Sequence, residues 1–185
     1  MRDRLFRANT FTIGRGFDWL RPRKMFILRG GIFMTHADEV LRLDQQLCFA
    51  LYRASRALIR SYTPLLEPLG LTYPQYLVLL VLWEEDGLSV KRLGKRLSLD
   101  SATLTPLLKR LELQKIVERH RDTDDERVVR IRLTPEGKAL RTEARKVPPA
   151  MACHAGFDLS DANSVAKISQ IRGDLNALSA HLEEA

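Results

Sequence analysis

Two cysteines, Cys48 and Cys153, are the only thiols among the 185 residues of the chain. A thiolate attacks a peroxide to give a sulfenic acid, and a sulfenic acid condenses with a second thiol to give a disulfide. A free cysteine is, however, more often a small buried apolar residue than a reactive one. The stretch around Cys48, "LDQQLCFALYRASR", is an ordinary amphipathic helix pattern and leaves both interpretations open.

Other patterns that carry chemistry are missing from the sequence. The four histidines show no metal-ligand spacing, and the pair Cys153–His154 supplies too few ligands for zinc. There is no glycine-rich phosphate loop and no nucleophile elbow, so we expect no metal and no cofactor. Two cysteines so far apart do not resemble a secreted disulfide framework, which favours a reducing cytoplasm. No apolar run approaches the roughly 20 residues of a membrane helix, and no membrane contact is expected.

The formal net charge of +7 is unevenly distributed. Residues 1–33 carry eight Arg or Lys and two Asp, and residues 87–133 carry twelve Arg or Lys and seven Asp or Glu. A localised basic region of this kind favours a polyanionic partner. We interpret residues 1–33 as a disordered extension or a mis-assigned start before Met34, because they lack both periodicity and a signal-peptide pattern. The alternative is a genuine basic tail that adds non-specific DNA affinity.

The elements that must position these residues are mainly helical, within a domain spanning residues 34–185. Apolar residues spaced by three and four predict a long helix over residues 37–66. Helix-capping residues and β-branched alternation predict the elements that follow. These are a buried helix opened by Thr72 and Gln75, a short helix capped by Ser89, a second capped by Asp100 or Ser101, a β-hairpin ending near Leu133, a helix capped by Thr134 and interrupted at Pro148–Pro149, and a last helix over 160–181.

Two short helices followed by a basic hairpin predict a winged helix-turn-helix, with its DNA-binding lobe at about residues 87–133. A leucine stripe on the second short helix must face inward: Leu104, Leu107, Leu108 and Leu111. The hydroxyls and cations of the opposite side are then free to reach base edges and phosphates in a major groove. The residues predicted to contact DNA from this helix are Ser101, Thr103, Thr105, Pro106, Lys109 and Arg110, beside Ala102.

The predicted hairpin tip places Arg127 among four acidic residues, Asp122, Asp124, Asp125 and Glu126. An Asp–Arg pair, with Asp125 as the supporting acid, would hold the arginine extended so that it enters a minor groove. The alternative is a solvated turn with one surface ion pair, which would contribute little.

The segment "SLDSATLTPLLKRLELQKIVERHRDTDDERVVRIRLTPEGKAL" resembles the winged-helix core of MarR-type regulators. Within that family, "LDSATLTPLLKRLE", the "DER" wing and "LDQQLCFALYRASR" are most similar to the OhrR organic-hydroperoxide sensors. The resemblance covers about residues 38–183. It implies a homodimeric repressor of palindromic operator DNA, with a dimer interface formed by the helices at about 37–66 and 134–183. An organic hydroperoxide would release the operator and derepress a detoxification gene.

The resemblance also implies roles for individual residues. Cys48 matches the peroxidatic cysteine, and Tyr62 and Tyr73 match the two tyrosines that hold its thiol. Cys153 matches the resolving cysteine of the two-cysteine branch, which forms a disulfide across subunits. In the wing, Arg127 matches the arginine that enters the minor groove. Pro106, which is unusual inside a helix, also matches the recognition helix of this subfamily.

Helix geometry restricts where such a thiol site can be. Cys48 and Tyr62 are 14 residues apart, which is about 21 Å along a helix that rises about 1.5 Å per residue. A straight helix therefore cannot bring these two side chains together, and Tyr62 would have to come from a second subunit. Tyr52, one turn after Cys48, is a third candidate donor whose alternative role is interface packing.

Two other functions remain open on the sequence. One is a MarR-type repressor that is released by a lipophilic or phenolic ligand bound non-covalently. The other is a thiol peroxidase that uses Cys48 and Cys153. The winged-helix segment argues against an enzyme, so we expect a regulator.

Overall fold

The computed structural model describes residues 39–184, and the predicted N-terminal extension at residues 1–33 lies outside that range. The chain divides into two compact units at the bond between Ala50 and Leu51. The elements are η1 (Leu43–Gln45), α2 (Leu47–Leu66), η2 (Glu67–Leu69), α3 (Tyr73–Glu84), β1 (Leu88–Ser89), α4 (Val90–Leu97), α5 (Ser101–Leu113), β2 (Val117–Arg121), β3 (Val129–Leu133), α6 (Pro135–Ala144), α7 (Val147–His154) and α8 (Ala162–Glu183), where η denotes a 3-10 helix.

The first helix begins later than the sequence predicts. In place of a continuous helix from residue 37, the chain forms η1, becomes extended at Gln46 (φ −83°, ψ 118°) and only then enters α2. The Gln46 amide donates to the carbonyls of Val40 and Arg42, at 2.5 Å and 3.1 Å. A side chain thus satisfies carbonyls that a continuous helix would pair with backbone N–H groups, and it competes with helix formation there.

Four of the predicted helix starts are confirmed, because their capping side chains bond to the backbone they were expected to reach. Asp100, and not Ser101, caps α5. Gln75 Oε1 accepts from Thr72 N–H at 2.8 Å, Ser89 Oγ from Arg92 N–H at 3.2 Å, Asp100 Oδ1 from Thr103 N–H at 2.6 Å, and Thr134 Oγ1 from Gly137 N–H at 3.0 Å. These bonds satisfy N–H groups that a helix start leaves unpaired.

The wing belongs to a three-stranded antiparallel sheet in the order β1-β3-β2. The hairpin is confirmed, whereas β1 was not predicted and pairs Leu88 with Ile131. Asp86 fixes the turn before β1, because its Oδ1 accepts from the backbone N–H groups of Gly87 and Leu133, both at 2.8 Å. Gly87 itself has φ +76°, which a side chain would disfavour.

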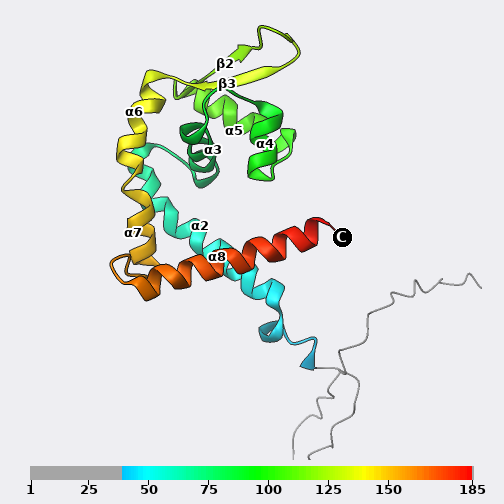
Figure 1. Cartoon of the computed structure of the whole chain (residues 1–185), viewed down its shortest axis with the longest axis vertical. Helices are drawn as coiled ribbons and strands as arrows, with labels where there is room; N and C mark the ends of the chain where they lie inside the picture. Colours follow the sequence, from blue (N-terminus) through cyan, green and yellow to red (C-terminus); the bar gives the residue numbers. More distant parts are fainter. Residues whose placement is uncertain (1–38, 185) are drawn as a thin grey trace, which may run out of the picture. The chain divides into compact units, whose positions relative to one another are not determined.

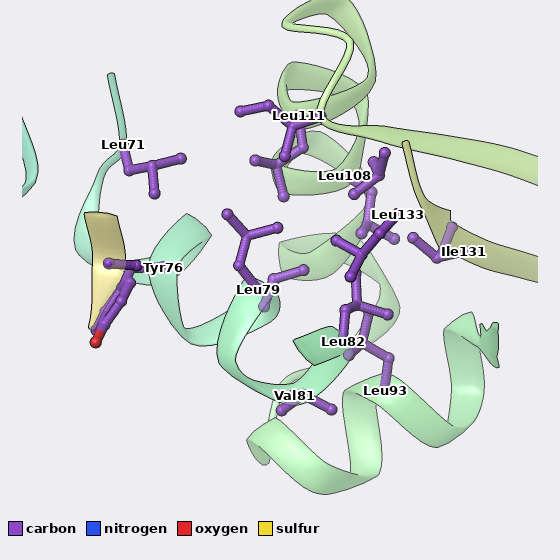
Figure 2. Close-up of a cluster of buried hydrophobic side chains, with 14 of the residues drawn as sticks. Leu71, Tyr76, Leu79, Val81, Leu82, Leu93, Leu108, Leu111, Ile131 and Leu133 are labelled. Atoms are coloured by element: carbon purple, nitrogen blue, oxygen red, sulfur yellow. The ribbon is translucent and has the colours of Figure 1, made fainter. Parts of the chain in front are cut away.

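The hydrophobic core lies between the three central helices and the sheet. Figure 1 shows α3, α4 and α5 gathered beside the β2–β3 hairpin. Leu79 and Leu82 of α3 meet Leu108 of α5 and Leu133 of β3 in one cluster (Figure 2). Burial of such side chains contributes about 1.5–3 kcal/mol each and holds the recognition elements in place.

Helices α6, α7 and α8 follow the sheet (Figure 1). The indole N–H of Trp83 in α3 donates to the carbonyl of Gly137 at 2.9 Å and ties α6 to the core. Pro148 and Pro149 interrupt the helix as predicted, since α6 ends at Ala144 and the prolines lie in the first turn of α7. No residue of α8, over 162–183, is buried in the single chain.

No single helix among residues 39–184 is both long and apolar enough to cross a membrane. One bent pair of helices, Leu47–Leu69 with Tyr73–Glu84, meets the length and composition requirement only when the two arms are combined.

Candidate nucleic-acid interface and candidate thiol site

Helix α5 separates its apolar and polar sides as the leucine stripe predicts. Leu104, Leu108 and Leu111 are buried, while Leu107 is only half-buried. All six residues of α5 that were predicted to contact DNA are exposed: Ser101, Thr103, Thr105, Pro106, Lys109 and Arg110. The helix therefore presents hydroxyls and two cations on the side that is free to enter a groove.

Arg119 of β2 fastens the wing to α5, and the sequence pattern did not single it out. Its Nε lies 3.1 Å from Glu112 Oε2, and its Nη2 donates to the Thr105 carbonyl at 3.4 Å. Both partners belong to α5. The contact joins α5 to the strand that leads into the wing tip.

The wing tip exposes Arg127 as predicted, with 96% of its side chain accessible. Asp125 Oδ1 accepts from the Arg127 backbone N–H at 3.0 Å and lies 3.6 Å from Arg127 Nε. The predicted Asp125–Arg127 pair is thus close in space. The guanidinium itself extends into solvent, where it is available to an anionic groove.

Helix α4 carries a second set of cations that the sequence pattern alone did not assign. Arg92 pairs with Glu85 at 2.8 Å and Arg96 with Glu84 at 2.5 Å, which directs both arginines toward the end of α3. Lys91 and Lys95 are exposed, and no hydrogen bond or ion pair joins the side chain of either lysine to another residue within 39–184. The signal was present in "VKRLGKRL", where the lysines are four residues apart and share one side of the helix.

A tyrosine cluster is formed by α2 and α3, and it brings together the two tyrosines predicted to support the thiol. The rings of Tyr62 and Tyr73 are 4.6 Å apart between centroids, and Tyr62 also lies 6.0 Å from Tyr76. Tyr76 in turn makes an edge contact with Trp83 at 6.3 Å. The sequence pattern did not single out Tyr76, which is buried beneath the pair and joins it to the core.

The phenols of this cluster remain protonated well above neutral pH. Burial raises the pKa of Tyr62 and Tyr73 above the usual value, and the neighbouring Tyr73 ring adds to the effect at Tyr62. Burial, followed by the two neighbouring phenols, raises the pKa of Tyr76 to about 12. Protonated phenols are hydrogen-bond donors, and donors stabilise a nearby anion such as a thiolate.

The two cysteines lie on different helices, and both are free and exposed in the single chain. Cys48 is in the first turn of α2, and Cys153 is in the last turn of α7, before Gly156. Cys48 belongs to the compact unit that ends at Ala50, whereas Tyr62 and Tyr73 belong to the other unit.

Tyr52, the third candidate donor, has a partner within its own helix. Arg56 Nη1 donates to the Tyr52 hydroxyl at 2.6 Å, and the guanidinium carbon lies 5.4 Å from the ring centroid. In this bond the phenolic oxygen is the acceptor, so the bond with Arg56 does not use the phenolic proton.

Within residues 39–184, no group of three or more His, Cys, Asp or Glu side chains could hold a metal ion. The α4–α5 pair and the basic hairpin define a winged helix-turn-helix protein with an exposed recognition helix. The family described as transcriptional regulator SarA/Rot matches residues 60–143.

Two relatives extend this match over most of the chain. The transcriptional regulator TtmR of Methylorubrum extorquens is 47% identical over 157 residues, which is 84% of this chain and 78% of that protein. The organic hydroperoxide resistance regulator of Bacillus subtilis is 46% identical over 134 residues, 71% of this chain and 91% of that protein. The chain belongs to the MarR family of transcriptional regulators, of the OhrR type. It is a regulator and not an enzyme.

Solved structures agree with the sequence relatives. Reduced AbfR bound to DNA is similar with a TM-score of 0.64 and 36% identity, covering 79% of this chain and 98% of that chain. The disulfide-formed AbfR is similar with a TM-score of 0.57 and 36% identity, covering 80% and 97%. The protein named AbfR comes from Staphylococcus epidermidis.

Proposed function

We propose that the protein is a homodimeric repressor that senses organic hydroperoxides through Cys48 and releases its operator when Cys48 is oxidised. The observation that carries the proposal is the Tyr62–Tyr73 pair, held at 4.6 Å and half-buried in an apolar setting. A pair of protonated phenols is a ready donor site for a thiolate. Within a straight α2, Cys48 cannot reach this pair, because it is nearly four turns away from Tyr62.

A second copy of the chain would supply the missing thiol. Helices α2 and α8 expose apolar side chains that association would bury: Leu47, Leu58, Ile59, Val165, Ile171, Leu175 and Leu182. Helices of this length owe most of their stability to packing of an apolar side. In a twofold dimer both chains use the same surface, and a residue of one chain can contact a different residue of its partner. Antiparallel packing of the two α2 helices would therefore bring Cys48 of each chain near the tyrosine pair of the other.

The sensing chemistry is a two-electron oxidation in two steps. The Cys48 thiolate attacks the terminal oxygen of the hydroperoxide, the O–O bond breaks, an S–O bond forms, and the alcohol leaves after taking up a proton. The resulting sulfenic acid then condenses with the thiol of Cys153 from the other subunit, which forms the disulfide and releases water. The two thiols are oxidised, and the hydroperoxide is reduced to alcohol and water.

A disulfide that draws Cys153 toward Cys48 of the partner chain would release DNA by moving α7. The two Cα atoms of a disulfide lie within about 7 Å of each other. Cys153 is in α7, which follows α6, and α6 contacts β3 of the wing sheet. A displacement of α7 would therefore move the lobes that carry α5 and Arg127. The distance between the two lobes would then no longer match the spacing of the two DNA half-sites. The similarity to AbfR structures named as reduced, DNA-bound and disulfide-formed supports this sequence of states.

The test is DNA release by an organic hydroperoxide. The DNA probe is a duplex operator that the wild-type protein selects from a randomised DNA pool. Cumene hydroperoxide should release the wild-type protein and leave Cys48→Ser bound. Release of Cys48→Ser under the same treatment would overturn the redox proposal and favour a non-covalent ligand mechanism.

Cys153→Ser separates the two chemical steps. We expect this variant to form the sulfenic acid at Cys48, detectable with a dimedone probe, but to give no dimer-sized band in non-reducing electrophoresis. A dimer-sized band in Cys153→Ser would show that a different thiol pairing operates.

A further inference from the structure

Asp122 differs from the other three acidic residues of the wing tip, because it is turned inward. Only 8% of its surface is exposed, whereas Asp124, Asp125 and Glu126 are exposed. Asp122 Oδ1 accepts from the backbone N–H groups of Asp124 and Asp125, at 2.9 Å and 3.4 Å. Its Oδ2 pairs with Arg130 Nε. Both carboxylate oxygens are thus engaged by donors from the chain itself.

Arg130 joins the wing tip to the base of the sheet. It lies on β3, opposite His120 of β2 in the strand register. Its Nη1 donates to the carbonyl of Gly87 at 3.2 Å, in the turn between α3 and β1. The Asp122–Arg130 pair therefore links the end of β2, strand β3 and the turn that follows a buried helix.

A continuous series of hydrogen bonds runs from Asp122 to Arg127. Asp122 N–H donates to the Val128 carbonyl at 2.8 Å, and Val128 N–H donates to the Asp125 carbonyl at 2.9 Å. Asp125, held by Asp122, accepts from Arg127 N–H at 3.0 Å. The Arg127 side chain is almost fully in solvent, so this loop backbone sets the position from which it extends.

We propose that Asp122 and Arg130 are positioning residues that fix the wing tip so that Arg127 points into the minor groove. The inference rests on the proposed DNA contact of Arg127 and extends it to residues that touch no DNA. A loop that is fixed before binding loses less conformational freedom when it binds, which strengthens the contact.

The same arrangement explains why the negative charge of Asp122 does not hinder DNA binding by the wing. The N–H groups of Asp124 and Asp125, together with Arg130, hold the pKa of Asp122 below its usual value, with the Asp124 N–H as the largest cause. Asp122 is therefore ionised at neutral pH, and its charge is compensated by Arg130. Asp124 is exposed at the tip, so its negative charge would repel the phosphates of bound DNA.

Neutralising Asp122 and neutralising Asp124 should change the affinity for DNA in different ways. Asp124→Asn removes one exposed negative charge, so affinity for the selected operator should rise or stay unchanged. Asp122→Asn removes the same charge but breaks the pair with Arg130, so affinity should fall about tenfold, the size expected for a single groove contact. If Asp122→Asn binds as tightly as Asp124→Asn, the wing acids act only through their charge and the inference is overturned.

A double-mutant cycle separates positioning from a general loss of structure. If Asp122 acts through Arg127, Asp122→Asn should weaken binding in the wild-type background and have little further effect in Arg127→Ala. Equal effects in both backgrounds would assign Asp122 a structural role and overturn the inference. If Arg127→Ala alone leaves affinity unchanged, the proposed wing contact itself fails, and the positioning role fails with it.

Discussion

The winged helix-turn-helix lobe and the long helices α2 and α8 differ in how many of their apolar side chains are buried within a single chain. In the lobe, Leu104, Leu108 and Leu111 are buried, and the helix starts are capped within the chain. In α2 only Leu66 is buried, and in α8 none of residues 162–183 is. One region thus buries its apolar side chains within a single chain, whereas the other exposes apolar surface that the proposed dimer would cover.

The largest effect is expected from the core of the lobe. Leu104→Ala removes a fully buried side chain between α5 and the other core helices, so the free energy of unfolding should fall by about 2–5 kcal/mol. Urea denaturation measures the change, and Leu113→Ala, at a side chain 75% exposed, is the control. Equal losses in the two variants would contradict the assignment of the core.

A smaller effect is expected in the long helices, on association instead of on folding. Leu175→Asp places a charge on the exposed apolar side of α8, so the dimer should weaken by about 2 kcal/mol, as for a central interface residue. Sedimentation measures the dissociation constant. Leu113→Asp makes the same change on an exposed leucine outside α2 and α8, and a comparable loss there would argue against an interface specific to these helices.

Salt dependence tests whether α4 takes part in DNA binding. Lys91→Gln and Lys95→Gln should each lower the slope of log affinity against log salt by about one, the change expected when one phosphate is no longer neutralised. Arg92→Gln and Arg96→Gln remove cations held by Glu85 and Glu84, so we expect a smaller change. If the arginine variants change the slope as much as the lysine variants, the two lysines have no special role.

The last effect, which is confined to pH above 10, is a pH dependence that arises from the tyrosine cluster. The folded protein keeps the Tyr76 proton to a pKa of about 12, whereas a free tyrosine has a value of 10.0. This stability is fully present below pH 10 and is lost as the pH rises toward 12, because the unfolded chain ionises first. Tyr76→Phe should reduce that decline in the free energy of unfolding, and an unchanged decline would contradict the burial of its phenol.

Local rules predicted most of the fold. Thr72, Ser89, Asp100 and Thr134 begin helices where capping requires them, since a cap depends on residues only two or three positions away. Strand β1 was missed because it is two residues long and forms by pairing Leu88 with the distant Ile131. The start of α2 was missed because the Gln46 side chain, and not a change of periodicity, ends the preceding turn.

The candidate sites were predictable as residue types but not as geometry. The resemblance named Tyr62 and Tyr73, yet only the turn between α2 and α3 shows that their rings touch. Among four wing acids, nothing local marks Asp122 as the one turned inward, since that depends on Arg130 across the hairpin. Lys91 and Lys95 became candidates once Arg92 and Arg96 were found paired.

A mixed dimer tests most directly the claim that the thiol site is built from two chains. One chain carries Cys48→Ser, and the other carries Tyr62→Phe and Tyr73→Phe; two different affinity tags isolate the mixed species. Each homodimer should react slowly with cumene hydroperoxide. In the mixed dimer the remaining Cys48 faces the intact tyrosine pair of its partner, so we predict one thiol that reacts at the wild-type rate. A mixed dimer as slow as the Tyr62→Phe, Tyr73→Phe homodimer would contradict the account.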